Sequence, residues 1–447
     1  MPAVPILSGV LANNGAGFEM SYPRNLEPVI VDTKLSKGQL RLTAGVRTFA
    51  TGPGTDRGAI VWNGLAYRVM GDKLVRWNGT TPTVLGTIPG TGPVMMDYGF
   101  DRISIAADGK LFYYDGTALT QVTDEDLGTV IDALWVDGFT MFTDGTYIGV
   151  TELSDPYQVK PLKYGSAEAD PDPITGIIKV REEVHAIGTN TIQVFQNVGG
   201  NGFPFQVIKG ATIPYGCVSR TAKCRFAESF AFVGSGRDEA LAVYVAGQGT
   251  AIKISTQRID RLLRECQDPT TIECESRVYG DEKRLLVHLP NLTLVYFADA
   301  SRDAGQPIWA EQDDASRHAV FVNGAYQVAK GAVVGILDDQ IGERFGERVR
   351  WSFDVGLLAN DGAAFLLHSV EAMGLPGRSD GVAFLSFTRD GQTYSTPKAQ
   401  KLGPVGARSK RVQWRPHMRF PTYVGMRFHG EGLFGVSTIQ IEGEPLT

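Results

Sequence analysis

The sequence predicts an all-β protein: a β-propeller of about seven blades, with an extended N-terminal arm before it and a C-terminal antiparallel β-sandwich-like domain after it. Two observations carry this prediction. A hairpin of two apolar strands recurs along the middle of the chain, and the rhythm of these hairpins changes near residue 341. The composition agrees, because 53 glycines and 22 phenylalanines among 447 residues are typical of many short strands joined by turns.

The recurring hairpin is clearest in two stretches, AYRVMGDKLVRWNG from Ala66 and ISIAADGKLFYYDG from Ile103. Each has an apolar strand, a tight polar turn and a second apolar strand that ends in Asn-Gly or Asp-Gly, residues that tolerate a positive φ. Similar hairpins start at residues 66, 103, 140, 184, 230, 285 and 326, with steps of 37, 37, 44, 46, 55 and 41. A hairpin period near about 40–45 residues predicts propeller blades, because a single blade cannot bury its own faces.

The longest step contains an insertion, STQRIDRLLRECQD, which predicts a short helix near residues 256–267. Its apolar residues follow helical spacing, Ser255 or Thr256 can cap its start, and Asp268-Pro269 ends it. The apolar stripe consists of Ile259, Leu262, Leu263 and Cys266. We expect this stripe to pack on the sheets rather than to form a groove for a partner.

The two ends of the chain differ from the repeats. Residues 1–50 are extended and punctuated by Pro and Gly, and we assign them to the arm. Residues 51–340 form the predicted propeller. In residues 341–447, the stretch VAFLSFTRDGQTYS (Val382–Ser395) alternates strictly and turns at Asp390-Gly391, which predicts a separate antiparallel sandwich.

Charge divides along the same boundary. The net charge is −6, but residues 340–447 hold 13 Lys and Arg against 10 Asp and Glu, a surplus of +3 that leaves −9 for the remainder. The basic residues gather in a set that we call the basic set: Lys398, Lys401, Arg408, Lys410, Arg411, Arg415 and Arg419. A solvated or subunit-facing edge is the favoured interpretation of this set, and a phosphate contact is the alternative. Alternation would place Arg411, Gln413 and Arg415 on one face of a strand.

The cysteines and the N-terminus indicate a protein folded in the cytosol. Cys217, Cys224, Cys266 and Cys274 form no C-x-x-C pair, and no His cluster accompanies them, so we expect four reduced thiols and no metal site. MPAVPILSGVLANNG has no basic start and no long apolar core, so it does not predict a signal peptide. No apolar run approaches the roughly 20 residues that cross a bilayer, so we expect no membrane insertion.

We find no catalytic constellation, and we expect neither an enzyme nor a cofactor. The sequence has no P-loop, no G-x-S-x-G and no H-E-x-x-H, and its six histidines are scattered. SFTRDGQTY is similar to the Asp-box hairpin of sialidase-type propellers, but it occurs once and its spacing is a residue short, so Asp390 is interpreted as a turn residue. In a strand, Glu182 and Glu183 would point to opposite faces and could not act together.

One ordered set of motifs resembles a known family. TNTIQVFQNVGGNGFPFQVIKGATIPYGCVSR and the strand FAFV that follows contain a TI-x-V-F strand, a Gly-rich link, Pro-Phe and an I-x-x-G-C-x-S segment. These motifs occupy Thr191–Phe195, Pro204-Phe205, Ile213–Ser219 and Phe230–Val233. The set resembles the tail-hub, or packaged-DNA-stabilisation (head-completion, tail nozzle), proteins of short-tailed bacteriophages.

The resemblance implies a structural virion protein, assembled in the host cytoplasm and located in the tail. It implies a homohexameric ring that docks beneath a portal-adaptor protein, closes the portal channel and retains packaged DNA. The ring would carry tail fibres or spikes and a tail needle or plug, and double-stranded DNA would leave through its lumen without tight binding. We expect the arm and the C-terminal domain, as a ring- and portal-side platform, to make most contacts.

A carbohydrate-binding or glycan-cleaving propeller, such as a receptor-binding tail protein, is the alternative function. A hydrolase of this kind would place two carboxylates about 5–10 Å apart in a cleft. Activity on host polysaccharide and the mass of the protein in solution would separate the two functions.

Overall fold

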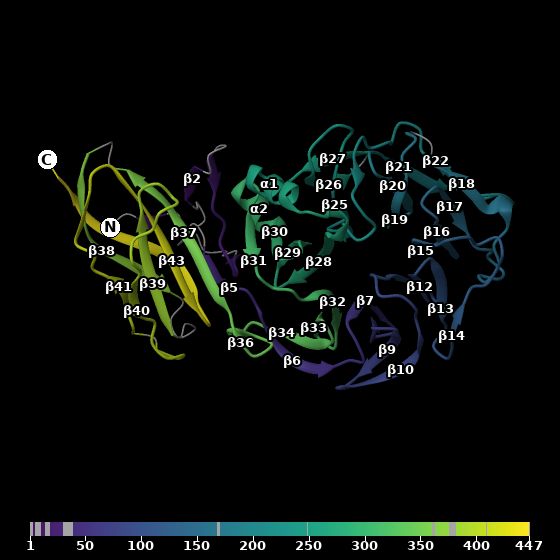
Figure 1. Cartoon of the computed structure of the whole chain (residues 1–447), viewed down its shortest axis with the longest axis horizontal. Helices are drawn as coiled ribbons and strands as arrows, with labels where there is room; N and C mark the ends of the chain where they lie inside the picture. The colour runs from purple at the N-terminus through teal and green to yellow at the C-terminus, as the bar shows by residue number, and fades with distance from the viewer. Residues whose placement is uncertain are drawn as a thin grey trace.

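The structure is a computed structural model, and it describes residues 3–4, 10–13, 18–29, 39–167, 170–247, 249–359, 363–374, 381–407 and 409–446. Figure 1 shows two bodies side by side, a ring of small sheets on the right and a pair of packed sheets on the left. The ring is a β-propeller and the pair is a β-sandwich, so the predicted fold class is confirmed.

Seven sheets form the blades of the propeller. Blade 1 consists of β7 (Asp56–Trp62), β8 (Leu65–Met70), β9 (Lys73–Asn78) and β10 (Thr81–Thr87). Blade 2 consists of β11 (Met95–Tyr98), β12 (Ile103–Ala107), β13 (Lys110–Tyr114) and β14 (Leu119–Gln121). Blade 3 consists of β15 (Asp132–Val136), β16 (Phe139–Thr143), β17 (Tyr147–Val150) and β18 (Tyr164–Ser166). Blade 4 consists of β19 (Ile174–Val180), β20 (Glu183–Gly188), β21 (Ile192–Asn197) and β22 (Phe205–Val207).

Of the last three blades, blade 7 includes a strand from the N-terminal part of the chain. Blade 5 consists of β23 (Gly216–Cys217), β24 (Lys223–Phe226), β25 (Ser229–Ser235), β26 (Ala242–Gly247) and β27 (Thr250–Lys253). Blade 6 consists of β28 (Glu273–Tyr279), β29 (Glu282–His288), β30 (Thr293–Phe297) and β31 (Trp309–Gln312). Blade 7 consists of β32 (Arg317–Val322), β33 (Ala325–Lys330), β34 (Val333–Asp338) and β6 (Gly45–Thr51), and the short strands β35 (Glu343–Arg344) and β36 (Glu347–Arg348) extend its sheet.

Each recurring hairpin of the sequence is the central hairpin of one blade. The hairpin from Ala66 is β8–β9 and the hairpin from Ile103 is β12–β13. The other five are β16–β17, β20–β21, β25–β26, β29–β30 and β33–β34. The repeat was visible in the sequence because the two strands of each hairpin are consecutive in the chain. In blade 2 they are joined by a tight turn, which requires residues with positive φ such as Asp108 (φ 51°) and Gly109 (φ 73°).

The ring closes through a strand from the N-terminal part of the chain. The inner strands contact one another in a complete circle: β7, β11, β15, β19, β24, β28, β32 and β7 again. β6 pairs antiparallel with β34, with Thr51 opposite Val333 and Gly45 opposite Asp338. Residues 45–50, which the sequence assigned to the arm, therefore complete blade 7. The pairing ties the two ends of the ring together by backbone hydrogen bonds.

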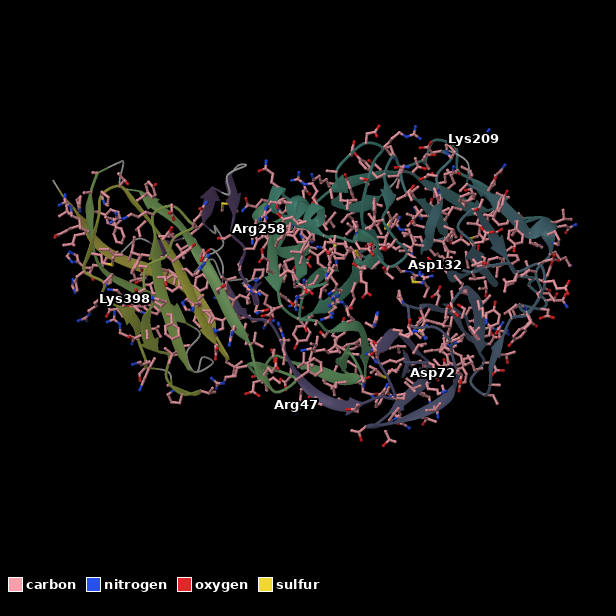
Figure 2. All side chains as sticks on the ribbon, in the orientation of Figure 1. Arg47, Asp72, Asp132, Lys209, Arg258 and Lys398 are labelled. Carbon is pink, nitrogen blue, oxygen red and sulfur yellow. The ribbon has the colours of Figure 1, made fainter. Side chains whose placement is uncertain are left out.

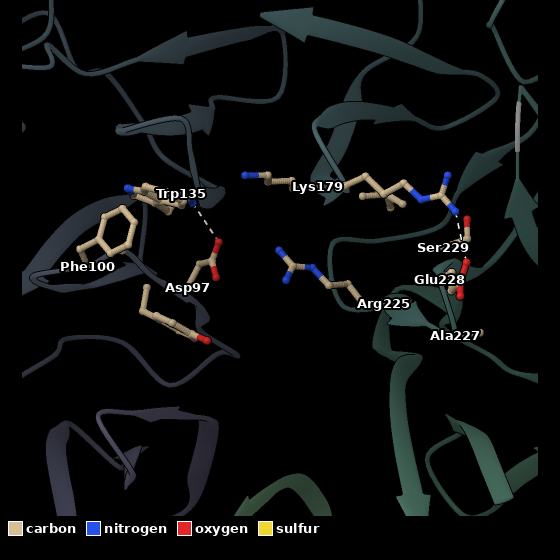
Figure 3. Close-up of a pocket in the computed structure, with 12 residues that line it drawn as sticks. Asp97, Phe100, Trp135, Lys179, Arg225, Ala227, Glu228 and Ser229 are labelled. Carbon is tan, nitrogen blue, oxygen red and sulfur yellow. Dashed lines mark hydrogen bonds and ion pairs between the residues drawn. The ribbon is translucent and has the colours of Figure 1, made fainter.

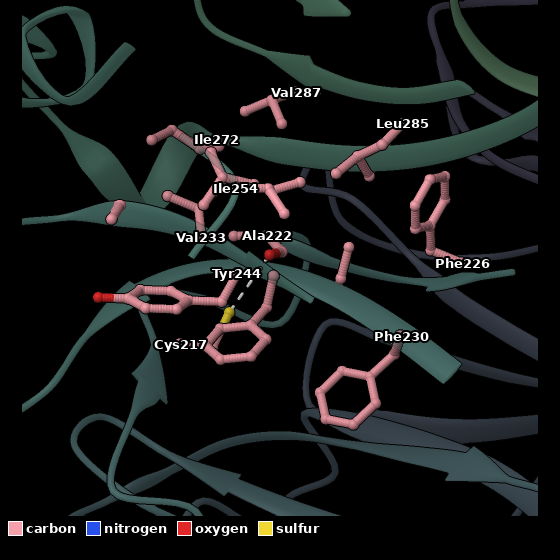
Figure 4. Close-up of a cluster of buried hydrophobic side chains, with 14 of the residues drawn as sticks. Cys217, Ala222, Phe226, Phe230, Val233, Tyr244, Ile254, Ile272, Leu285 and Val287 are labelled. Carbon is pink, nitrogen blue, oxygen red and sulfur yellow. Dashed lines mark hydrogen bonds between the residues drawn. The ribbon is translucent and has the colours of Figure 1, made fainter. Parts of the chain in front are cut away.

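The apolar core lies between neighbouring blades rather than within them. Trp62 and Tyr67 of blade 1 pack on Tyr114 of blade 2, with ring centroids 5.7–6.3 Å apart. Figure 4 shows part of a larger cluster that joins blade 5 to blade 6, with Val233 of blade 5 on the side of Leu285 and Val287 of blade 6. A blade removed from the ring would expose these faces to water, which is why the fold requires a closed circle.

The helix α1 (Gln257–Glu265) covers this cluster, and it lies within the segment predicted near residues 256–267. Ile259 and Leu263 of its stripe are buried, while Leu262 and Cys266 are half-buried against the same core. A second helix, α2 (Ala298–Ala304), follows β30, and 3-10 turns span Pro161–Lys163 and Pro269–Thr271.

The sandwich packs two antiparallel sheets over a core that contains Trp351, Phe353, Phe428 and Phe434. One sheet has the order β37 (Arg350–Ala359), β43 (Tyr423–Glu431), β39 (Val382–Thr388) and β40 (Lys398–Lys401). The other contains β4 (Leu26–Val29), β5 (Gln39–Leu42), β44 (Gly435–Pro445), β38 (Phe365–Gly374), β41 (Val412–Trp414), β42 (Met418–Phe420) and β1 (Ala3–Val4). β2 (Leu11–Asn13) and β3 (Phe18–Met20) form a separate hairpin. The arm is thus built into both domains where the structure describes it.

Candidate interaction surfaces

The described members of the basic set gather along one edge of the sandwich. Lys398 and Lys401 lie on β40, Arg411 and Arg415 flank β41, and Arg419 lies on β42. β41 and β42 both pair with β38, and the indole N–H of Trp414 donates to the carbonyl oxygen of Lys398 (2.7 Å), which brings β41 against β40. In Figure 1 these strands lie on the far side of the sandwich from the propeller, and Figure 2 labels Lys398 there.

Most of these cations are exposed. Lys398, Lys401, Lys410, Arg415 and Arg419 are exposed, while Arg408 lies outside the described residues. The side chains of Val412 and Trp414 are buried in the sandwich, so the alternation that the sequence predicted for this strand is confirmed.

Arg411 differs from the other members of the set, because it is already paired within the chain. Its Nε and Nη2 donate to the two carboxylate oxygens of Glu371, at 2.8 and 2.5 Å. These bonds from Arg411 lower the pKa of Glu371. Arg411 therefore holds β41 to β38, and the exposed cations beside it form the free part of this edge.

A buried polar junction joins the sandwich to the propeller. Arg24 forms backbone bridges with Ser352 of β37 and with Glu311 of β31. Asn25 is fully buried; its amide donates to the carbonyl oxygen of Arg350 (2.6 Å), and its Oδ1 accepts from the backbone N–H of Asp313 (3.1 Å). One short segment therefore bonds to both domains.

Charged groups reinforce this junction. Arg344 donates to Asn25 Oδ1 (3.1 Å) and to Asp313 (3.0 Å). The carboxylate of Glu27, on β4, is 2.7 Å from Arg41 Nε and 3.1 Å from Arg284 Nη1 of β29. A buried carboxylate with two cationic partners is costly to break, because removal of one partner leaves a charge without compensation. These contacts hold the two domains in one orientation.

The inner strands use most of their cations internally. Arg68 and Asp56 form a buried ion pair (2.9 Å), and His318 Nδ1 is 2.7 Å from the same Asp56 oxygen. Lys223 and Asp132 form a second buried pair (2.8 Å). Arg57 donates to four backbone carbonyl oxygens of blade 1 and the link to blade 2. These cations fasten blades together.

His318 lies where blade 7 meets blade 1. Burial by itself lowers the pKa of His318, but the hydrogen bond and charge of Asp56, with the nearby charge of Glu273, raise it above the usual value. The imidazole therefore bridges the closing blade to the first blade, and the Asp56 carboxylate favours its charged form.

The residues considered for chemistry form no reaction centre in the part of the chain that the structure describes. No group of three or more His, Cys, Asp or Glu there could hold a metal ion. The four cysteines are unpaired, and burial raises the pKa of Cys217 to about 11. Asp390 accepts from the backbone N–H groups of Gln392 and Thr393, which makes it a turn residue as predicted. No described helix is long and apolar enough to span a membrane.

Sequence reasoning did not find the junction residues or the clefts described below. Asn25 and Arg344 are 319 residues apart, so no local pattern connects them. A usable signal existed for the clefts: Tyr98, Trp135, Lys179 and Arg225 are separated by 37, 44 and 46 residues, the same steps as the hairpins.

Comparison with known proteins covers both domains. Residues 2–342 match the family described as Bacteriophage P22 Gp10, beta-propeller, and residues 350–444 match Bacteriophage P22 Gp10, beta-sandwich. The Tail hub protein gp10 of Salmonella phage P22 is 28% identical over 425 residues, which cover 88% of each chain.

Among solved structures, the Neurospora crassa Pan2 WD40 domain has a TM-score of 0.41 and 8% identity over 66% of this chain and 96% of that chain. The N-terminal domain of Nup159 has a TM-score of 0.41 and 10% identity over 71% of this chain and 99% of that chain. Because the two family models match the propeller and the sandwich, and together cover most of the chain, the chain belongs to the bacteriophage P22 Gp10 family.

Proposed function

We propose that this protein is a tail hub, a structural component of a bacteriophage virion. The observation that carries the proposal is the similarity to the tail hub protein of phage P22, which extends over 88% of each chain and over both domains. The proposed role is structural rather than enzymatic. The fixed junction at Asn25 and Glu27 supports it, because a hub has to transmit load between its two domains without changing their orientation.

The proposed assembly is a homohexameric ring beneath a portal-adaptor protein, with the sandwich as its ring- and portal-side platform. The exposed part of the basic set supports this orientation, since it faces away from the propeller. Unpaired cations concentrated on one edge suit a partner surface rich in carboxylates, where charge complementarity speeds association and fixes register. The cations that remain available are Lys398, Lys401, Lys410, Arg415 and Arg419.

The proposed ring closes the portal channel, retains packaged DNA and later conducts it outward. Each phosphate contact would add salt-dependent affinity, and many of them would slow ejection. The net charge of −9 outside the C-terminal domain, together with the internal pairing of Arg68 and Lys223, supports passage of DNA without tight binding. Tail fibres or spikes and a needle or plug would attach to the outward surfaces of the ring. The protein would assemble in the host cytoplasm and remain in the virion tail.

A charge-reversal experiment tests the docking edge. The variant Lys398→Glu/Arg415→Glu changes two exposed cations and leaves the Arg411–Glu371 pair intact. The protein should fold normally and fail to join heads, because two repelling charges replace two attractive ones at the proposed contact. The matched control, Lys110→Glu/Lys209→Glu, carries the same charge change on exposed propeller residues.

The readout is the yield of DNA-filled, infectious particles when each variant complements a phage that lacks the gene. Loss with the edge variant and normal titre with the control supports the docking edge. Normal titre with both variants would contradict it.

A further inference from the structure

A cleft of about 540 Å³ opens where four inner strands of the propeller end. We call it the aromatic cleft and define it by Tyr98, Phe100, Trp135, Lys179 and Arg225 (Figure 3). Tyr98, Trp135, Lys179 and Arg225 come from β11, β15, β19 and β24, at equivalent positions of four consecutive blades. The cleft is therefore built on rigid elements rather than on long loops.

One wall of this cleft is aromatic and open to solvent. Phe100 is 89% exposed, and its ring meets Trp135 edge to face with centroids 5.2 Å apart. Tyr98 is half-exposed beside them. Gly99 allows this arrangement, because a Cβ there would lie only 2.7 Å from Trp135 Cδ1. A phenylalanine held in water forgoes about 1.5–3 kcal/mol of burial free energy, which a ligand surface could recover.

The opposite side of the aromatic cleft is charged. Lys179 Nζ lies 5.1 Å from the centre of the Trp135 ring, and Figure 3 shows Arg225 pointing across the cleft toward Asp97. Arg225 is exposed and makes no hydrogen bond or ion pair with any residue that the structure describes. Asp97 accepts the backbone N–H of Trp135 (2.8 Å), yet burial raises its pKa. Lys179 Nζ is also 4.0 Å from Asp137 Oδ1. The site thus offers one guanidinium without a partner among the described residues, one ammonium group with a distant carboxylate partner, and one buried carboxylate.

A second, larger cleft of about 940 Å³ adjoins the first, and Arg181 and Glu228 line both. We call it the polar cleft; the polar side chains that distinguish it are Asp137, Glu182, Glu183, His185, Gln196 and Asn197. His185 is only 7% exposed, and its Nδ1 has no hydrogen-bond partner among the described residues. A buried imidazole nitrogen without a partner is costly, so a ligand that bonds to it would be favoured.

We propose that the two clefts together bind an oligosaccharide that carries a carboxylate on one of its sugars. The C–H faces of pyranose rings would pack on Phe100 and Tyr98, and the sugar carboxylate would pair with Arg225 and Lys179. The sugar hydroxyls, which both donate and accept, would bond to the carboxylate, amide and imidazole groups of the polar cleft. Both volumes lie in the range of about 300–1,000 Å³ that ligand sites occupy.

The charge pattern separates this ligand from the other anionic candidates. A nucleic acid or an acidic peptide would place several negative charges along both clefts, where Asp137, Glu183 and Glu228 would repel them. Phosphodiesters also have no donor for Asp97. An oligosaccharide with a single acidic sugar supplies one negative charge at the cationic end and hydroxyl donors elsewhere. The proposal is independent of the tail-hub assignment, because it concerns the propeller face and no assembly contact.

The test uses the purified full-length protein and isothermal titration calorimetry. The probes are a neutral oligosaccharide that carries one galacturonic acid, a neutral oligosaccharide that carries one sialic acid, the methyl-esterified form of the first, and single-stranded DNA. At least one acidic oligosaccharide should bind. The methyl ester, which keeps the rings and removes the charge, should bind about tenfold or more weakly if Arg225 and Lys179 hold the carboxylate.

Two variants locate the site and one controls for charge. Phe100→Ala and Arg225→Gln alter exposed side chains and should leave thermal stability unchanged while each weakens binding about tenfold or more. Lys209→Gln, an exposed cation elsewhere on the propeller, should have no effect. The proposal is wrong if neither acidic oligosaccharide binds, if the ester binds equally well, if both site variants bind as the parent does, or if single-stranded DNA binds in their place.

Discussion

The ion pair between Asp56 and Arg68 should be one of the largest single contributions to propeller stability, and Asp56→Asn tests it. One Asp56 oxygen is 2.9 Å from Arg68 Nη1 and 2.7 Å from His318 Nδ1, so the carboxylate links blade 1 to blade 7. The side chains of Arg68 and Asp56 are 0% and 3% exposed. Asparagine keeps the shape of the side chain and removes its charge.

The magnitude follows from the bonds that remain. Loss of one partner of a buried ion pair costs about 3–5 kcal/mol, since the other charge stays buried without compensation. Arg68 also donates to the carbonyl oxygens of His318 and Gln327, which still solvate part of its charge in the variant. We therefore expect a loss at the lower end of this range, about 3 kcal/mol in the free energy of unfolding.

The assay is urea unfolding followed by circular dichroism, with Glu228→Gln as the matched control. Glu228 pairs with Arg181 at 3.2 Å, but both side chains are largely exposed, so the control should barely move the midpoint. If Asp56→Asn shifts the midpoint no more than the control does, the pair does not hold the ring closed, and this reasoning is refuted.

Two further predictions concern protonation and redox state. Because the pKa of His318 is raised in the folded protein, its contribution to stability should be fully present below about pH 6.5 and should decline as pH rises through the folded pKa. The difference in unfolding free energy between the parent and His318→Gln should therefore shrink from about pH 6 to pH 9. A difference that grows over this range would contradict the assignment. Labelling of the denatured protein without reductant should find all of Cys217, Cys224, Cys266 and Cys274 reactive, and a count of two or none would reveal disulfides.

The blades could be predicted from the sequence because their signal is local. Each central hairpin joins two strands that are consecutive in the chain, across a link of two to six residues, so alternation and turn residues are sufficient to find it. The closing strand is different. Nothing within Gly45–Thr51 indicates that its partner is Val333–Asp338, because that pairing spans almost the whole propeller. The same limit applies to β4 and β5, which resemble an extended arm and lie in the sandwich sheet.

For the candidate surfaces too, local features could be predicted from the sequence and contacts between distant residues could not. Alternation placed Val412 and Trp414 in the core and Arg411 outside, which the structure confirms. The carboxylate that pairs with Arg411 could not be predicted, since Glu371 is 40 residues away on a neighbouring strand. The clefts were missed because the hairpin spacing is the signal that connects Tyr98, Trp135, Lys179 and Arg225, and spacing alone does not show that these side chains meet when four blades lie in a circle.

Electron microscopy of the purified protein mixed with its portal complex tests the central claim most directly. The tail-hub assignment predicts a closed homohexameric ring at the portal end, with each sandwich and its β40–β41 edge against the connector and each propeller farther from it. A complex in which the propellers face the connector would contradict the proposed platform, and a protein that stays monomeric and unattached in the presence of its portal complex would contradict the tail-hub assignment itself.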